Sequence, residues 1–284
     1  MQNNDTLEIR SKSIRKSNDL ITKSRFDLSI QQQKILLYII AQIKPYDEDF
    51  KTYSFSIQEF CRVCGISSSG KNYSDLKAAI KGIRDKSVWV TMPDGKESLL
   101  AWIEKAKIDG GNGTVEIRLD DDLKPFLLQL KENYTQYELI YTLNFQSKYT
   151  IRLYELIKCI HYHDLERYSR VYSISELKTL LGAETYKTTQ HFKDRVIAPS
   201  VSEINEYSDK MVSYSFIKTG RAYTDIEFTI WSKETLEALK IRDAIEKRMG
   251  VSQMTFYDEL QELGYIPQRG QDVEAREPDS PGAP

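Results

Sequence analysis

Phe55-Ser56-Ile57-Gln58-Glu59-Phe60-Cys61-Arg62-Val63-Cys64-Gly65 returns in outline 117 residues later, as Tyr172-Ser173-Ile174-Ser175-Glu176-Leu177-Lys178-Thr179-Leu180-Leu181-Gly182. Each copy follows an apolar segment with a tyrosine and precedes a basic segment and a β-hairpin pattern. The unit is too long for a solenoid repeat, whose period is about 20–50 residues. Helix, short helix, turn, second helix and hairpin is the order of a winged helix-turn-helix. The sequence therefore predicts an α+β chain with two tandem winged-helix domains, a fold that binds DNA.

Helix-capping residues support the alignment of the two copies. Ser56 and Glu59 have the spacing of a capping box, in which a serine side chain and a glutamate three residues later satisfy the first backbone N–H groups of a helix. Ser173 and Glu176 repeat that spacing at the same offset. The two copies therefore start their short helices in the same way.

The pattern of strands and helices gives expected domain bounds. We expect a leader at 1–13, a first winged-helix domain at 14–134, a second at 135–231, C-terminal helices at 232–266 and a disordered acidic, proline-containing tail at 267–284. Alternating residues predict one long three-stranded wing over 87–119 and a hairpin from strands 211–217 and 225–231. Residues 120–130 are expected to form a helix.

Composition restricts the class of protein. The chain has 284 residues, of which 40% are hydrophobic and 29% charged, as in a soluble globular protein of two domains. It has no apolar run of membrane-spanning length and no apolar signal core at residues 1–5. Three cysteines give no disulfide framework. These features predict a cytoplasmic protein.

The net charge of −2 conceals an uneven distribution. Residues 10–25 contain six Lys or Arg against one Asp, a net +5, whereas residues 258–284 contain two Arg against seven acids, a net −5. One interpretation is a basic DNA-binding body with an acidic tail. The other is that residues 10–25 form a solvated surface.

Three short motifs suggest other chemistry. Residues 65–71 fit GxxxxGK, but a phosphate-binding loop follows a strand and has Ser or Thr where this chain has Asn72. We interpret this segment as the turn of the helix-turn-helix instead. Cys61 and Cys64 form a CxxC, which supplies only half of a zinc site. In the repeat they align with Lys178, expected at the surface, and Leu181, expected in the core.

The third motif is His161-Tyr162-His163, which together with Tyr207-Ser208-Asp209-Lys210 fits the metal site and nucleophile of a rolling-circle nickase. Both histidines of such a site must lie on one face of a strand. Here they end a predicted helix, where residues i and i+2 point about 200° apart. A nickase site is therefore the weaker interpretation.

The second copy carries the main candidates for DNA contact. Residues 187–221 contain six Lys or Arg against four acids, in the predicted second helix and the wing tip. The helix offers polar side chains suited to base edges, and the wing offers cations suited to phosphates. The candidates in this copy are Lys187, Thr189, Gln190, Lys193, Arg195, Lys218 and Arg221. The candidates in the first copy are Lys71, Asn72, Ser74, Lys77 and Lys81.

A series of motifs in order resembles a known family. The motifs are Asn18-Asp19-Leu20-Ile21, Tyr134-Thr135-Gln136-Tyr137-Glu138-Leu139, Ser147-Lys148-Tyr149 with Arg152-Leu153-Tyr154-Glu155-Leu156, Phe192-Lys193-x-Arg195-Val196-Ile197-x-Pro199 with Glu203-Ile204, and Ile217-Lys218-x-Gly220-Arg221. From about residue 14 to 231 the chain resembles the iteron-binding initiator proteins of theta-replicating plasmids, the RepA, RepE and Pi type. The resemblance does not cover the CxxC segment or residues 232–284.

The resemblance implies a non-enzymatic plasmid replication initiator without cofactor or metal. Its implied partners are double-stranded origin DNA with directly repeated sites, a host initiator and helicase, and a second copy of the chain in a dimer that represses its own gene. We expect the hairpin region 87–119 to form the dimer surface, because strand edges invite pairing. Two alternatives stay open: a metal-dependent nickase, and a transcriptional repressor with no replication role.

Overall fold

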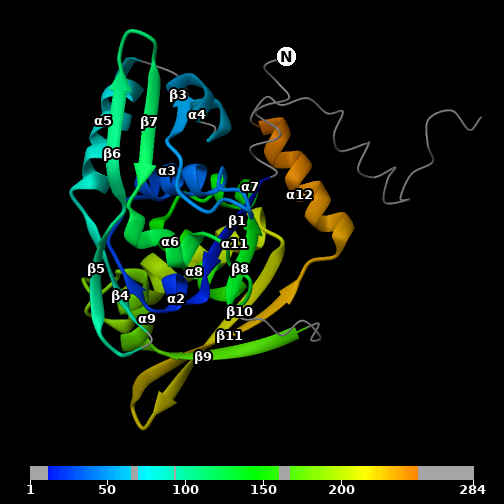
Figure 1. Ribbon diagram of the computed structural model, residues 1–284. Helices are drawn as coiled ribbons and strands as arrows, with labels where there is room; N and C mark the ends of the chain where they lie inside the picture. Colours follow the sequence, from blue (N-terminus) through cyan, green and yellow to red (C-terminus); the bar gives the residue numbers. More distant parts are fainter. Residues whose placement is uncertain (1–11, 65–69, 93, 160–166, 249–284) are drawn as a thin grey trace, which may run out of the picture.

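The computed structural model describes residues 12–64, 70–92, 94–159 and 167–248; for residues 70–72, 235–236 and 246–248 it describes the backbone only (Figure 1). None of the helices in these ranges is long and apolar enough to span a membrane. Two winged-helix modules make up the fold, and Figure 1 shows their wings at opposite ends of the molecule.

The first module extends from strand β1 to helix α6. Its elements are β1 (Ser13–Ser17), α2 (Asn18–Thr22), β2 (Ser24–Arg25), α3 (Ile30–Ile40), β3 (Tyr53–Ser56), α4 (Ile57–Val63), α5 (Gly70–Arg84), β4 (Ser87–Thr91), β5 (Glu97–Ala101), β6 (Ile103–Asp109), β7 (Thr114–Leu119), the 3₁₀ turn η1 (Asp121–Leu123) and α6 (Lys124–Leu127).

The second module extends from strand β8 to strand β11, and helix α12 follows it. The elements are β8 (Tyr134–Glu138), α7 (Leu139–Leu143), α8 (Lys148–Lys158), β9 (Arg167–Ser173), α9 (Ile174–Leu181), α10 (Thr189–Phe192), the π-helical turn η2 (Lys193–Ile197), α11 (Ala198–Tyr207), β10 (Lys210–Thr219), β11 (Ala222–Ser232) and α12 (Thr235–Arg248).

The serine half of each predicted capping box is present, and the Glu59 carboxylate bonds to Tyr38 rather than back to its N-cap. The Ser56 hydroxyl accepts the N–H of Glu59 at 2.9 Å, and the Ser173 hydroxyl accepts the N–H of Glu176 at 3.2 Å. The carboxylate of Glu59 accepts a hydrogen bond from the Tyr38 hydroxyl at 2.9 Å, which joins α4 to the buried helix α3. The two short helices therefore start alike, as the repeat predicts.

The wing of the first module differs from the predicted single three-stranded sheet over residues 87–119. Strands β4 and β5 form a sheet in the order β2-β4-β5, whereas β6 and β7 form another in the order β3-β7-β6. Between β5 and β6, Trp102 and Ile103 are both buried. Neighbouring residues of one strand face opposite sides, so two consecutive buried residues mark the place where the chain leaves one sheet for the other.

The predicted helix over residues 120–130 is also wrong, because only the short turns η1 and α6 form there. Leu128 is already extended and Gln129 has a positive φ of 49°. In the second module the predicted hairpin forms in the expected register, with Val212 opposite Ile230 and Phe216 opposite Ile226. Strand β9 adds a third strand, in the order β10-β11-β9.

The two modules share structure across their junction. Strand β1 pairs antiparallel with β8, from Ser13 opposite Glu138 to Ser17 opposite Tyr134. Helix α8 contacts α2 and α3 of the first module and α9 of the second. Their buried apolar residues form one continuous cluster. The boundary predicted near residue 135 falls at β8, the strand that pairs with β1, and stays a prediction.

A buried ionic network lies at this junction. The Glu155 carboxylate, on α8, lies 2.6 Å from the Lys16 ammonium of β1, accepts the Tyr137 hydroxyl at 2.6 Å and accepts Arg152 Nη1 at 3.0 Å. Arg152 also donates to the carbonyls of Ile21, Ser24 and Leu180. Burial pushes the pKa of Glu155 upward, but Lys16 and Arg152 outweigh it and hold that pKa below its ordinary value.

Candidate nucleic-acid interface

The second module presents its candidate recognition helix after a tightly fixed turn. Gly182 ends α9 with φ +64°, a conformation that disfavours residues with a Cβ, and a Cβ there would lie 3.2 Å from the Phe26 carbonyl oxygen. The Lys178 ammonium holds the turn through the Tyr186 carbonyl at 2.6 Å. The Thr188 hydroxyl then accepts the N–H of His191 at 3.1 Å and caps α10.

The recognition helix contains one wide turn. The N–H of Ala198 donates to the carbonyl of Lys193, five residues back, which is the bond of a π-helix. Pro199 follows directly; it has no N–H, and its ring would crowd the carbonyl four residues earlier in a regular helix. The helix therefore accommodates Pro199 through a π turn at residues 193–197, a feature that recurs at functional sites.

Burial defines the inner face of this helix. Phe192, Val196 and Ile204 are buried. Of the candidates, Lys187, Gln190 and Arg195 are exposed, whereas Thr189 and Lys193 are half-buried. The helix therefore carries four candidates, Thr189, Gln190, Lys193 and Arg195, and Lys187 lies just before its N-cap.

Two side chains on the exposed side were missed from the sequence. His191 is exposed, and Asp194 accepts both hydrogen bonds of the Gln190 amide, at 2.9 and 2.8 Å. The spacing of four residues between Gln190 and Asp194 is the available signal, since such pairs meet on a helix surface. Gln190 must break this contact, or share it, before it can read a base.

The wing of the second module ends in two exposed cations. Gly220, with φ +65°, turns the chain between Lys218 and Arg221. The Lys218 ammonium lies 4.7 Å from the centre of the exposed Tyr223 ring, a cation–π contact. The tip therefore combines positive charge with an aromatic surface, which suits phosphate and sugar contacts.

In the first module, α5 carries Ser74, Lys77 and Lys81 on its exposed side, opposite the buried Leu76 and Ile80. Lys81 pairs with Asp85 one turn later. The backbone of Lys71 and Asn72 lies in the first turn of α5, but their side chains lie outside the described part of the structure, as does the turn at 65–69.

Further cations near α5 were also missed. Arg84 lies seven residues after Lys77, and Lys105 lies on the adjacent strand β6; both are exposed. The seven-residue spacing was a usable signal for Arg84. Lys105 could be found only from the packing of β6 against α5, which the sequence alone does not show.

In the described part of the basic run, residues 12–25, most cations are engaged in contacts within the fold. Lys16 is buried against Glu155, Lys23 pairs with Asp19 and Arg25 pairs with Glu97. The Arg15 guanidinium donates to the Gln136 side chain at 2.8 Å. The contacts of Arg15, Lys16 and Arg25 join β1 and β2 to neighbouring elements, so these three cations serve the fold.

The motifs that suggest other chemistry have structural roles where they are described. Cys61 and Cys64 are both buried, so the surface position expected for Cys61 is wrong: α4 turns that residue into the core. Asp209 accepts the Tyr154 hydroxyl at 2.7 Å and the Lys158 ammonium at 2.8 Å. Burial pushes the pKa of Asp209 upward, but Lys158 outweighs it and lowers that pKa.

Within the described ranges, no group of three or more His, Cys, Asp or Glu side chains is arranged to hold a metal ion. His161 and His163 lie outside those ranges.

Comparison with known proteins agrees with this architecture. Residues 13–158 match the family described as "Initiator Replication protein, WH1", and residues 173–230 match "Initiator Rep protein, WH2". The chain is 26% identical over 201 residues to an Escherichia coli replication initiation protein, covering 68% of this chain and 62% of that protein, so it spans less than two thirds of this relative's length.

Two further proteins are similar. An uncharacterised 27.6 kDa Escherichia coli protein is 20% identical over 230 residues, covering 76% of this chain and 95% of that one. The Pi initiator protein, crystallised in complex with iteron DNA, superimposes with a TM-score of 0.67 at 18% identity, covering 79% of this chain and 99% of Pi, which shows a shared fold. The two family matches account for both winged-helix modules, and the chain belongs to the family of replication initiator proteins built from a WH1 and a WH2 domain.

Proposed function

We propose that this protein initiates plasmid replication by binding directly repeated origin sequences, or iterons, with both winged-helix modules. The observation that carries the proposal is the second module, in which a capped helix with four polar or basic candidates, preceded by Lys187, is followed by a wing tip with two exposed cations. The fold shared with an initiator that was crystallised on iteron DNA supports it.

The contacts divide by chemistry. Lys193, Arg195 and Gln190 of the recognition helix would read base edges, since Arg and Lys pair with guanine and Gln with adenine in the major groove. Lys218 and Arg221 would bind phosphates. In the first module, Lys77 and Lys81 would add contacts along α5, which increase affinity and its dependence on salt.

The first module would also form a dimer. Trp89 and Leu99 are cross-strand neighbours on β4 and β5, and they are 45% and 53% exposed. Strand β5 is the edge of its sheet. Exposed apolar pairs at a strand edge favour association with a second copy. The dimer would repress the protein's own gene, and the monomer would open the origin and recruit the host initiator and helicase.

A footprint of the purified protein on repeated origin DNA tests the proposal. A monomer that uses both modules should protect about two helical turns, because successive major grooves on one face lie about 10–10.5 base pairs apart. Protection of a single turn would show that one module does not contact DNA.

Two further assays separate the rival functions. Incubation with supercoiled origin DNA and Mg²⁺ or Mn²⁺ should leave the strands intact, and nicks would identify a nickase. A replicon that carries only the gene and its nearby repeats should be maintained in cells. Binding without maintenance would favour a transcriptional repressor.

A further inference from the structure

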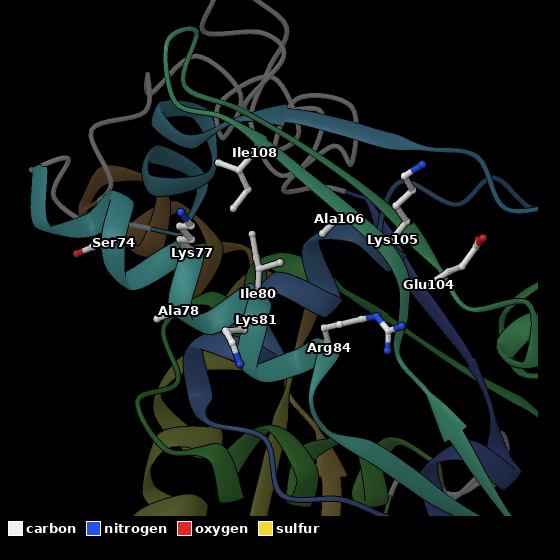
Figure 2. Close-up of a pocket in the computed structure, with 10 residues that line it drawn as sticks. All are labelled: Ser74, Lys77, Ala78, Ile80, Lys81, Arg84, Glu104, Lys105, Ala106 and Ile108. Atoms are coloured by element: carbon white, nitrogen blue, oxygen red, sulfur yellow. The ribbon is translucent and has the colours of Figure 1, made fainter.

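A groove of about 770 Å³ lies between helix α5 and strand β6 of the first module (Figure 2). Ile80 and Ile108 point toward one another across the groove. Ile80 is buried, so the exposed apolar surface of the lining comes from the half-buried Ile108 and the exposed Ala106 and Ala78. Four cations line it: Lys77, Lys81, Arg84 and Lys105. This is the size of a site that holds a sizeable ligand or a short peptide segment.

The second module shows why the groove is open. The two N-cap serines align β3 with β9: Ser56 lies opposite Thr114 on β7, and Ser173 lies opposite Asp225 on β11. Thr114 of β7 therefore aligns with Asp225 of β11, and the residues that follow align one by one. The residues of β6 and β10 that pair with them align in the same way.

The corresponding residues differ in size. Ala106 pairs with Ile117, where the second module has Tyr214 paired with Phe228. One step toward the tip, Ile108 corresponds to Phe216. The rings of Tyr214 and Phe216 lie 5.9 Å apart and pack against the core of the second module. An alanine and an isoleucine at these positions leave the seam between helix and wing unfilled in the first module.

The charge of the groove is positive. Among the described residues, Lys77, Arg84 and Lys105 have no ion-pair partner, whereas Lys81 pairs with Asp85. Glu104, the acidic residue of the lining, pairs with Arg118 outside the groove. An apolar floor with a cationic rim fits a segment that is both apolar and acidic.

This chain contains one such segment outside the described residues. Residues 256–266 read Phe-Tyr-Asp-Glu-Leu-Gln-Glu-Leu-Gly-Tyr-Ile. Phe256, Leu260 and Leu263 have the spacing of one helical face, and three acids lie between them without a Lys or Arg. Helix α12 ends at Arg248, and the eight residues from there to Phe256 can span up to about 27 Å when extended.

We propose that residues 256–266 dock in the groove between α5 and β6 of the same chain. Phe256, Leu260 and Leu263 would cover Ala106 and Ile108, and the carboxylates would lie against the rim cations. Docking would cover Lys77 and Lys81, so it would compete with DNA for the first module. That regulatory consequence rests on the proposed function, whereas the docking itself does not.

A disulfide cross-link in the full-length chain tests the docking. Ala106→Cys is combined with Glu259→Cys, oxidised mildly and mapped by mass spectrometry. We expect an intramolecular disulfide whose yield does not depend on protein concentration. The matched control combines Glu259→Cys with Ser215→Cys, an exposed site on β10 of the second module. A yield no higher than the control, or cross-links only between chains, would overturn the proposal.

Filling the groove tests the consequence. Ala106→Tyr copies the second module and should displace the segment, so the full-length variant should bind random duplex DNA more tightly, on the order of ten-fold at low salt. Leu260→Ser with Leu263→Ser should have the same effect. Unchanged affinity in both variants would overturn the competition. A cross-link without any DNA binding would refute only the proposed function, and specific DNA binding without the cross-link would refute only the docking.

Discussion

Replacing Glu155 with glutamine should destabilise the protein more than any surface change. In the fold the Glu155 carboxylate lies between Lys16 and Arg152 and accepts the Tyr137 hydroxyl. Glu155→Gln leaves two buried cations without a counter-charge. Breaking a buried ion pair from one side costs about 3–5 kcal/mol, and we expect a loss of that size in the free energy of unfolding at pH 7.

A second variant separates charge from shape. Lys16→Met removes one cation and leaves Arg152 paired with Glu155 at 3.0 Å, so the cluster loses one charged hydrogen bond and no unpaired charge remains. That loss should be smaller, about 1–3 kcal/mol. Glu206→Gln, at an exposed position on α11, is the control and should stay within about 0.5 kcal/mol of the parent.

Acid should act on the same group. The pKa of Glu155 is lower in the folded protein than the ordinary value of about 4.3. Its contribution is therefore complete above the ordinary pKa and is lost as the pH falls through the folded pKa. Urea unfolding followed by circular dichroism measures both effects. The reasoning fails if the free energy of unfolding of Glu155→Gln lies within about 1 kcal/mol of that of the Glu206→Gln control. It also fails if the free energy of unfolding of Glu155→Gln falls in acid as steeply as that of the parent protein.

Three further perturbations follow from the fold and the interface. Lys193→Ala should weaken iteron binding by about 1–3 kcal/mol and reduce the preference for iterons over random DNA. Lys218→Ala should weaken binding to all DNA sequences equally and lower the slope of log affinity against log salt concentration by about one. If both variants lose as much affinity for random DNA as for iterons, the helix does not read bases. Gly182→Ala should cost about 1–2 kcal/mol in thermal unfolding because φ is +64°, and an unchanged melting temperature would contradict this. Cys61→Ala with Cys64→Ala should reduce stability but leave DNA affinity unchanged, and stoichiometric zinc in the purified parent would show a metal site instead.

Local signals in the sequence were sufficient for the parts of the fold that depend on neighbouring residues. The serine caps at Ser56 and Ser173 follow from a spacing of three residues. The hairpin of the second module follows from the alternation that faces Val212 and Ile230 toward the core. The duplication was visible in the sequence because both copies have the same serine caps and are followed by hairpin patterns.

The features that sequence reasoning missed depend on distant partners. Lys16 belongs to a basic run, yet it is buried because Glu155, 139 residues away, neutralises it. The change of sheet at Trp102 depends on β2 and β3 as partners, which periodicity in residues 97–109 does not reveal. On the recognition helix, the sequence places Gln190 outward but does not show that Asp194 already holds its amide.

The pairing of β1 with β8 also has a consequence for symmetry. Each strand leads its module into a short helix and then a long buried one, so the strands are equivalent, and equivalent strands that pair antiparallel are related by a local two-fold axis. The outward wings in Figure 1 agree with that relation. A single chain therefore has an approximate two-fold relation at its junction, but its halves differ in their sheets and in their side chains, as Ala106 and Tyr214 illustrate. A DNA site for such a molecule has a direction, and inverting one site in an array would exchange the two modules on it.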